Sequence, residues 1–372
     1  MKSNMKFFDL TGQNKKIRNE IDRAISRVID SGVYINGDEV KKFEEGLAKF
    51  CGTKYAISCN SGTDALLLSL RALDIREGDE VITTPFTFIA TASTIILAGA
   101  KPVFADIDPN TLNIDPELIE KSITKKTKAI IPVHIFGRMC QMDKICKIAK
   151  KYKLKVIEDS AQSIGSIYKG KKSGTWGNAG CFSFFPTKNL GCFGDGGAIV
   201  TNDKYFYGKA RQLKNHGSDA KNKYLHLKIG INSRLDAIQA AVLCVKLKHL
   251  ESYNGARQEI AESFNKNFCG LNDIIIPEFN DGEHTFHQYT LRTKNREVLA
   301  KYLAGKGIPT MIYYPTPLHL QPALENLGYK KGDFPHCEQA CKEVISLPVW
   351  PELSAQEKNS IIKSINNFFK KL

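Results

Sequence analysis

The chain has 372 residues, 42% hydrophobic and 25% charged, which is enough for a large α/β core and a smaller appended domain. No run of about 18 apolar residues occurs and the first residues lack an apolar stretch of signal-peptide length, so we expect a cytoplasmic protein without a membrane-spanning helix. The net charge of +14 would suit a nucleic-acid binder, but the lysines are scattered along predicted helix faces, which favours a solvated surface or some attraction for an anionic ligand.

The ten cysteines indicate reduced thiols rather than disulfides or a metal site. Cys51, Cys59, Cys181 and Cys244 lie inside apolar runs, where cysteine usually acts as a small core residue. No set of Cys and His residues has the spacing of a zinc site. We therefore expect structural thiols and no metal.

The first predicted elements are two amphipathic helices. Residues 16–30 and 38–50 both carry apolar side chains at helical spacing, and Gly32 ends the first helix.

An alternation of strands and helices follows. The predicted strands are Tyr55–Cys59, Glu80–Thr84, Pro102–Asp106, Ala129–His134, Lys155–Glu158, Gly180–Phe185 and Ala198–Thr201. The predicted helices between them are Asp64–Leu73, Thr87–Leu97, Pro116–Ile123 and Met142–Lys151. Short strands separated by helices of about three turns indicate an α/β fold with a mostly parallel sheet covered on both faces.

The pattern changes after Asn232. Residues 235–253 read as one long helix, and the later helical stretches are 256–268, 295–306 and 355–370. Strand-like runs lie at 273–276, 287–293 and 309–314. This part is typical of a smaller α+β domain, so we predict a large domain at 1–250 and a small C-terminal domain at 251–372.

A strand-to-helix turn, Asn60–Asp64, is a candidate phosphate site. The first amides of a helix are free donors, and the helix dipole favours an anion there. Gly62 lets a phosphate approach the backbone, and Thr63 adds a hydroxyl. The alternative is a simple helix cap, because Ser, Thr and Asp are all good capping residues.

Asp159 and Lys188 are the candidate catalytic pair. Asp159 lies at the carboxyl end of a predicted parallel strand, the edge at which open α/β sheets bind ligands, and Lys188 lies on a turn beyond the next apolar strand. Pyridoxal phosphate chemistry requires such a lysine, which holds the cofactor as a Schiff base, and an acid that keeps the pyridine nitrogen protonated. Alone, the acid could be a helix cap and the lysine a surface residue; the phosphate turn makes the combination specific.

With these residues in place, the chain resembles the fold-type I pyridoxal phosphate enzymes, specifically the DegT/StrS-like nucleotide-sugar aminotransferases. The resemblance covers about residues 8 to 352. The stretches that carry it include Asn60–Leu66, Gly78–Ile82, Pro85–Phe88, Pro132–His134, Glu158–Gln162, Ser183–Gly191, His216-Gly217, Asn232–Asp236, Gln239–Ala241, Tyr314–His319 and Leu347-Pro348.

The resemblance implies roles for the remaining site residues. Gln162 would contact the phenolic oxygen of the cofactor, and Phe88 would stack on its ring unless it is a core aromatic. Gly62, Thr63 and Ser183 would bind the phosphate. Asn232 would reach the phosphate of the neighbouring subunit, which implies a homodimer with shared active sites. The candidates for the sugar-nucleotide pocket are Asn189, Arg234, Tyr314 and His319.

The resemblance also implies the reaction. A branch of the family that has histidine in place of the lysine performs dehydration, so Lys188 favours transamination. The amino donor would be L-glutamate, which leaves as 2-oxoglutarate with pyridoxamine phosphate as the intermediate cofactor form. The acceptor would be a keto sugar linked to UDP or dTDP.

The residues after Lys188 look like those of members that aminate C3. The variant Cys192–Asp195 is most like enzymes acting on UDP-2-acetamido-3-keto sugars, including the hexuronate form, for surface-glycan or lipopolysaccharide synthesis. A dTDP-3-keto-6-deoxyhexose is the close alternative, and a 4-keto sugar a weaker one. Rival classes are a catalytically silent cofactor-binding regulator, a lysine-retaining dehydratase and another fold-type I enzyme.

Overall fold

The computed structural model describes residues 5–278 and 282–370. Its centre is a seven-stranded sheet in the order β1-β9-β8-β5-β4-β2-β3. The strands are β1 (Tyr55–Cys59), β2 (Glu80–Thr83), β3 (Lys101–Phe104), β4 (Thr127–Ile130), β5 (Lys155–Asp159), β8 (Ala179–Ser183) and β9 (Gly197–Thr201). The pairs from β3 to β8 are parallel, whereas β9 runs antiparallel to both of its neighbours, β8 and β1. The α/β fold with a mostly parallel sheet is therefore confirmed.

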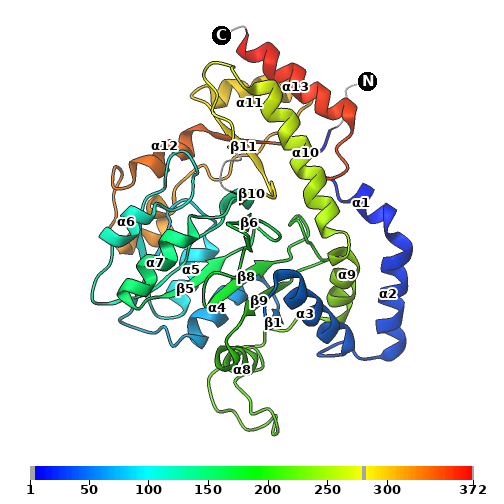
Figure 1. Ribbon diagram of the computed structural model, residues 1–372, viewed down its shortest axis with the longest axis vertical. Coiled ribbons are helices and arrows are strands. Elements are labelled where there is room, and N and C mark those ends of the chain that lie inside the picture. Colours follow the sequence, from blue (N-terminus) through cyan, green and yellow to red (C-terminus); the bar gives the residue numbers. More distant parts are fainter. Residues whose placement is uncertain (1–4, 279–281, 371–372) are drawn as a thin grey trace.

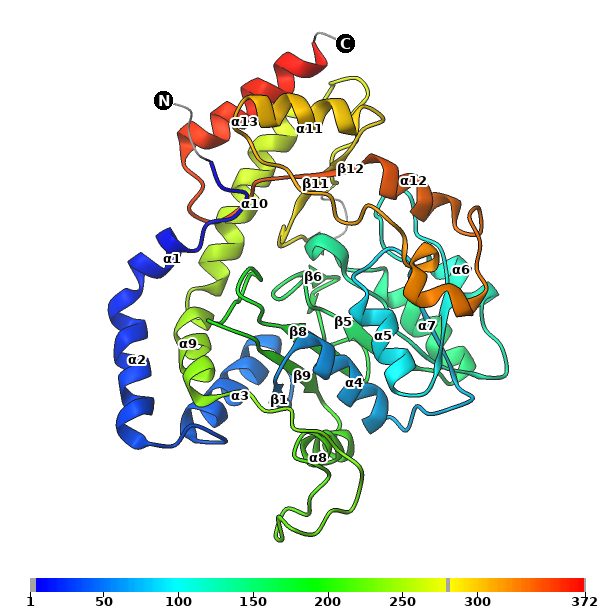
Figure 2. The ribbon, with the colours of Figure 1, turned by 180° about the vertical axis from the view of Figure 1, so that it is seen from behind.

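Helices cover both faces of the sheet because successive strand residues point to opposite sides. On one face, α2 (Arg18–Ser31), α3 (Asp38–Cys51) and α9 (Ala237–Leu247) pack on Ala56 and Val200. On the other face, α4 (Gly62–Ala72) and α8 (Lys204–Leu213) pack on Ile57 and Ile199. Figures 1 and 2 show α6 (Pro116–Lys121) and α7 (Met142–Tyr152) beside the other end of the sheet.

The C-terminal part has its own apolar cluster. It is built from α10 (Leu250–Phe268), α11 (Arg296–Gly305), α13 (Ala355–Phe369) and the antiparallel pair β11 (Tyr289–Arg292) and β12 (Val344–Leu347). Figure 1 shows α10 as a long helix that runs from α9 up to α11 and α13, at the end of the molecule where both chain termini lie. The division into 1–250 and 251–372 stays a prediction; those limits include residues 1–4, 279–281 and 371–372, which lie outside the described ranges.

The remaining elements are short. They are α1 (Thr11–Lys16), α5 (Ala90–Leu97), α12 (Pro335–Glu343), the small three-stranded sheet of β6 (Ile167–Tyr168), β7 (Lys171–Lys172) and β10 (Gly282–Glu283), and the 3-10 turns Ile135–Gly137, Leu318–Leu320 and Pro322–Leu327. Across residues 5–278 and 282–370, none of the helices combines the length and the apolar character needed to cross a membrane. The ten cysteines are free in this structure, and seven of them are buried.

Several predicted boundaries were wrong. The helix expected at 235–253 is broken, because α9 ends at Leu247 and α10 begins at Leu250. The strand-like runs 273–276 and 309–314 form only single bridges, Ile275 with Arg292 and Met311 with Ser346. Pro277 and Pro309 lie at these runs, and proline cannot donate to a strand ladder.

Candidate active site

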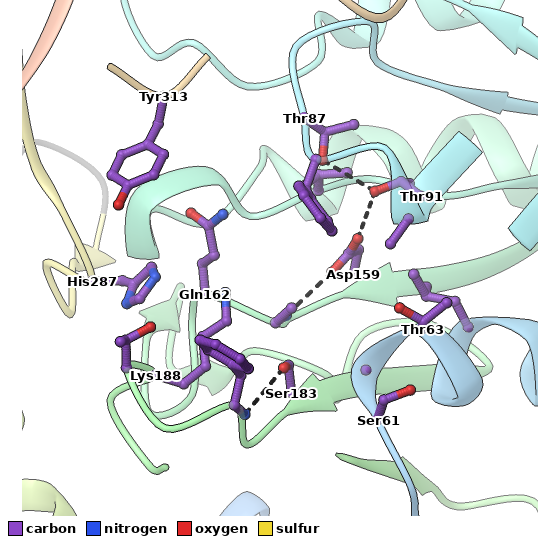
Figure 3. Close-up of a pocket in the computed structure, with 18 of the residues that line it drawn as sticks. Ser61, Thr63, Thr87, Thr91, Asp159, Gln162, Ser183, Lys188, His287 and Tyr313 are labelled. Atoms are coloured by element: carbon purple, nitrogen blue, oxygen red, sulfur yellow. Dashed lines mark hydrogen bonds between the residues drawn. The ribbon is translucent and has the colours of Figure 1, made fainter. Parts of the chain in front are cut away.

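A cavity of about 590 Å³ lies at the carboxyl ends of β1, β5 and β8. Each of these strands delivers a polar group to it: the start of α4 follows β1, Asp159 ends β5, and Ser183 ends β8. Figure 3 shows these groups facing one another from separate elements. The edge of the sheet predicted to bind a ligand is therefore the edge that is hollow.

The start of α4 forms a close-packed anion cradle. Ser61 caps the helix by accepting a hydrogen bond from the Asp64 amide at 3.1 Å. A Cβ on Gly62 would lie 2.7 Å from Cβ of Ser183, so only glycine fits between the helix and β8. The amides of Gly62 and Thr63, in the first turn of the helix, make no hydrogen bond in the described part of the chain and face the cavity with the helix dipole behind them.

Asp159 is a buried carboxylate held by two donors. Its Oδ2 accepts a hydrogen bond from the hydroxyl of Thr91 at 2.8 Å, and Oδ1 accepts one from the amide of Ala161 at 3.2 Å. Because the Thr91 proton is used in this way, Thr87 must donate to Oγ1 of Thr91 at 3.1 Å. Burial raises the pKa of Asp159, against these two hydrogen bonds and the charge of Lys188. No ion pair to Asp159 exists among the described residues, so the site favours a cationic ligand atom there.

Lys188 lies on the loop between β8 and β9 and lines the cavity on the side away from the start of α4 (Figure 3). Burial lowers its pKa to about 8, although the carboxylate of Asp159 partly opposes the shift. Its ammonium group forms no ion pair among the described residues. A lysine with such a pKa exchanges protons readily near neutral pH.

Gln162 and Tyr314 form one side of the cavity. Gln162 accepts a hydrogen bond from the amide of Phe136 at 2.8 Å and donates to the Tyr314 hydroxyl at 3.2 Å. Phe88 lines the cavity and is 57% exposed, so it is not a core aromatic. Its ring lies 6.4 Å from that of Tyr314, which leaves a ring face available to a planar ligand.

Three of the four residues expected in the sugar pocket do not line the cavity of this chain. Asn189 is buried and bonded to Asn254 and Thr285. His319 is buried with its Nε2 3.1 Å from Glu338, on a turn outside the cavity. Arg234 has a buried Nε with no hydrogen-bond partner in the described chain. Tyr314 lines the cavity, and the roles of all four residues toward a sugar stay predictions.

Asn232 is exposed and also lies outside the cavity of its own chain. The next residue, Ser233, donates to Asp64 at 2.7 Å and accepts from the amide of Asn60 at 3.2 Å. The segment is therefore fixed beside the start of α4, with Asn232 pointing to the surface. Its role toward a second subunit stays a prediction.

No role was expected for Thr91, Tyr313 and His287, which line the cavity, and Ser61 was expected only as a possible helix cap. Thr91 could have been selected by its helical i,i+4 spacing from Thr87. Tyr313 and His287 belong to segments far along the chain that reach the cavity only through tertiary packing.

The arrangement fits pyridoxal phosphate. The open amides and the hydroxyl of Thr63 suit a phosphate, the buried carboxylate of Asp159 suits a protonated ring nitrogen, and Lys188 suits an aldehyde. Glycine at position 62 agrees with a phosphate at the start of α4, because any Cβ there would fill the space between the helix and Ser183.

Residues 15–366 match the family model described as the DegT/DnrJ/EryC1/StrS aminotransferase family. The chain is 45% identical to UDP-2-acetamido-2-deoxy-3-oxo-D-glucuronate aminotransferase of Pseudomonas aeruginosa, over 98% of this chain and 100% of that protein. It is 40% identical to dTDP-3-amino-3,4,6-trideoxy-α-D-glucose transaminase of Streptomyces venezuelae, over 97% and 95%. It is also 47% identical, over 99% of both chains, to a protein of Geobacillus stearothermophilus named pleiotropic regulatory protein.

Two solved structures are similar over nearly all of this chain. S. venezuelae DesV in complex with a ketimine intermediate superposes with a TM-score of 0.96, at 40% identity over 99% of both chains. NtdA of Bacillus subtilis with bound cofactor PMP superposes with a TM-score of 0.90, at 32% identity over 95% of this chain and 82% of that one.

Proposed function

Because this chain belongs to the DegT/DnrJ/EryC1/StrS aminotransferase family, we propose that it moves the amino group of L-glutamate to C3 of a UDP-linked 2-acetamido-3-keto sugar, a hexose or a hexuronate. At the coarser level, it is a pyridoxal-phosphate-dependent aminotransferase of nucleotide-linked keto sugars. The observation that carries the reaction type is one cavity that holds a readily titrating lysine, a buried carboxylate and an open helix N-terminus.

Pyridoxal phosphate, when bound, supplies an aldehyde that can carry an amino group and a ring that withdraws electrons from the carbon being deprotonated. The start of α4 and Ser183 would hold its phosphate, Asp159 its ring nitrogen and Gln162 its phenolic oxygen, while Phe88 would cover the ring. Thr91 orients the carboxylate of Asp159.

Lys188 is the group that moves protons. With a pKa of about 8, its amine is available as a base close to neutral pH, and its ammonium form remains populated as an acid. In the first half of the reaction Nζ takes the α-proton of glutamate, and in the second half it gives a proton to C3 of the sugar.

The names of several relatives support C3 as the sugar carbon that receives the amino group. The P. aeruginosa protein is named for a 3-oxo sugar, and a 42% identical protein of Acidithiobacillus ferrooxidans is named as a UDP-N-acetyl-3-dehydro-α-D-glucosamine 3-aminotransferase. The alternative acceptor is a dTDP-3-keto-6-deoxyhexose, which the S. venezuelae relative favours. A relative named for spore coat polysaccharide biosynthesis supports a role of the product in a surface glycan such as lipopolysaccharide.

We infer that the enzyme works as a homodimer with shared sites. Lys188 is the only Lys or Arg among the described residues that line the cavity, yet the cofactor phosphate, glutamate and a nucleotide diphosphate are all anions. Asn232 and Arg234 of a second subunit would supply donors. The preceding loop exposes a row of apolar side chains that a partner could cover: Tyr224, Leu225, Leu227 and Ile229.

The experiment runs the reaction in reverse, because amino sugars are more stable than keto sugars. Purified protein with pyridoxal phosphate and 2-oxoglutarate is offered UDP-linked 2-acetamido-3-amino sugars, in hexose and hexuronate forms, and dTDP-linked 3-amino and 4-amino sugars. Glutamate formed is measured for each. The proposal predicts the highest kcat/KM for a UDP-3-amino sugar, and a preference for a 4-amino sugar would refute it.

A further inference from the structure

His287 is a buried polar residue whose role the reaction outlined above leaves open. It precedes β11, is 6% exposed, and lines the cavity on the side from which Lys188 enters (Figure 3). No residue of the described chain forms a hydrogen bond with its Nε2. A largely buried residue that lines a cavity and leaves a ring nitrogen without a protein partner points to a ligand contact.

The neighbouring Asn189 fixes which ring nitrogen carries the proton. The Asn189 amide nitrogen donates to the carbonyl oxygen of Thr285 at 3.0 Å, and a carbonyl can only accept, so this assignment cannot be flipped. Oδ1 of Asn189 therefore faces Nδ1 of His287 at 3.1 Å. Because Oδ1 only accepts, the proton lies on Nδ1.

The imidazole is neutral. Burial holds the pKa of His287 well below its ordinary value, and the charges of Lys188 and Arg257 lower it further. A neutral ring with its proton on Nδ1 presents a bare lone pair at Nε2.

The backbone around His287 is held on several sides, so this lone pair has a fixed direction. Arg257 donates to the carbonyl of Phe286 at 3.2 Å, and the Thr285 amide donates to the carbonyl of Gly137 at 3.1 Å. Asn189 itself is anchored to Asn254 on α10 at 2.8 Å. The acceptor is thus part of the rigid frame rather than of a mobile loop.

We propose that Nε2 of His287 accepts a hydrogen bond from an O–H or N–H group of the keto sugar beside the reacting carbon, and that Asn189 is the positioning residue that fixes its tautomer. This rests on the proposed function. A lone pair repels carboxylate and phosphate oxygens, so the contact selects a donor and excludes the anionic parts of the substrate. The position beside Lys188 places the contact at the sugar ring and not at the nucleotide.

Two substitutions of His287 distinguish the proposed contact at Nε2 from the hydrogen bond of Nδ1 to Asn189. His287→Asn keeps an N–H near Nδ1 for Asn189 but places nothing at Nε2, whereas His287→Gln can place an oxygen acceptor near the position of Nε2. The holoenzyme variants are titrated with a UDP-linked 2-acetamido-3-amino sugar, its 4-deoxy analogue and its analogue without the 2-acetamido group. The dTDP-linked counterparts are used if those bind more tightly.

We expect one of the two analogues to bind wild type about 5–50-fold more weakly than the parent sugar, as for an unmade hydrogen bond in a buried site. The same analogue should bind His287→Asn within twofold of the parent, and His287→Gln should recover part of the difference. The analogue that shows this pattern identifies the donor as the hydroxyl or the amide. If the losses caused by the variant and by each analogue simply multiply, the contact does not exist.

The tautomer is tested without substrate or turnover. Protein labelled with ¹⁵N-histidine is examined by long-range ¹H–¹⁵N spectra, with His287→Asn used to assign the signals. A neutral ring protonated at Nδ1 between pH 6 and 8.5 supports the proposal, and Asn189→Ala should release the other tautomer. An imidazolium, or a proton on Nε2 in wild type, overturns it. If no amino sugar nucleotide binds wild type, the proposed function fails together with the sugar contact, although the tautomer result still stands.

Discussion

The hydrogen bond from Thr91 tests whether the ionised carboxylate of Asp159 is needed to bind a cationic cofactor ring. Thr91 donates to Oδ2 of Asp159 at 2.8 Å, deep in the protein, and Thr91→Val removes the donor with almost no change in shape. A hydrogen bond to a buried charged group contributes about 1.5–3 kcal/mol. Because 1.4 kcal/mol is a factor of ten, cofactor binding that needs the ionised carboxylate should weaken about 10–100-fold.

The assay is a titration of pyridoxal phosphate into cofactor-free protein, followed by protein fluorescence or by cofactor absorbance. Thr94→Val is the matched control, since Thr94 is buried on the same helix but its hydroxyl bonds only to the carbonyl of Thr91 at 3.1 Å. The control should bind the cofactor within about threefold of wild type. Equal Kd values for wild type and Thr91→Val, or equal losses in both variants, would refute the reasoning.

Two further substitutions test the cradle and the lysine. Gly62→Ala should lower the free energy of unfolding by about 1–3 kcal/mol, because the added Cβ meets Ser183 at 2.7 Å, whereas Gly208→Ala, with open space around it inside α8, should be neutral or stabilising; chemical denaturation measures both. Lys188 has a pKa of about 8 in the folded chain against 10.5 ordinarily, so between these pH values only the unfolded chain binds the proton and stability rises with pH. Between pH 8 and pH 10, the free energy of unfolding of the cofactor-free protein should therefore increase by about 1–3 kcal/mol less in Lys188→Met than in wild type, as measured by chemical denaturation. An equal increase in both proteins would contradict the lowered pKa.

The site residues that lie at the ends of predicted strands could be predicted from the sequence. Asp159 and Gly62 each lie where a strand ends, and parallel strands bring such ends to one edge of the sheet. The parts that depend on packing between distant segments could not be predicted. Asn189 follows Lys188 and was expected to contact the sugar; that its amide contacts Asn254 on α10, Thr285 and His287 had no signal in the sequence. His287 itself has no periodic or motif signal, because its position depends on contacts from three separate parts of the chain.

The fold shows the same division. The strand Tyr55–Cys59 was predicted with its correct limits, since an apolar run bounded by turn residues is a local signal. The reversed direction of β9 and the break between α9 and α10 were not foreseen, because both are set by neighbouring elements rather than by their own residues.

The central claim is that the protein transfers the amino group of glutamate to a nucleotide-linked 3-keto sugar, with Lys188 as the group that moves the protons. Its most direct test supplies ¹⁵N-labelled L-glutamate, pyridoxal phosphate and a UDP-linked 2-acetamido-3-keto sugar made in situ, and follows the product by mass spectrometry. We predict an amino sugar nucleotide that carries the ¹⁵N label with wild type and none with Lys188→Ala. An unlabelled amino product, or a labelled one formed equally well by Lys188→Ala, would contradict the account.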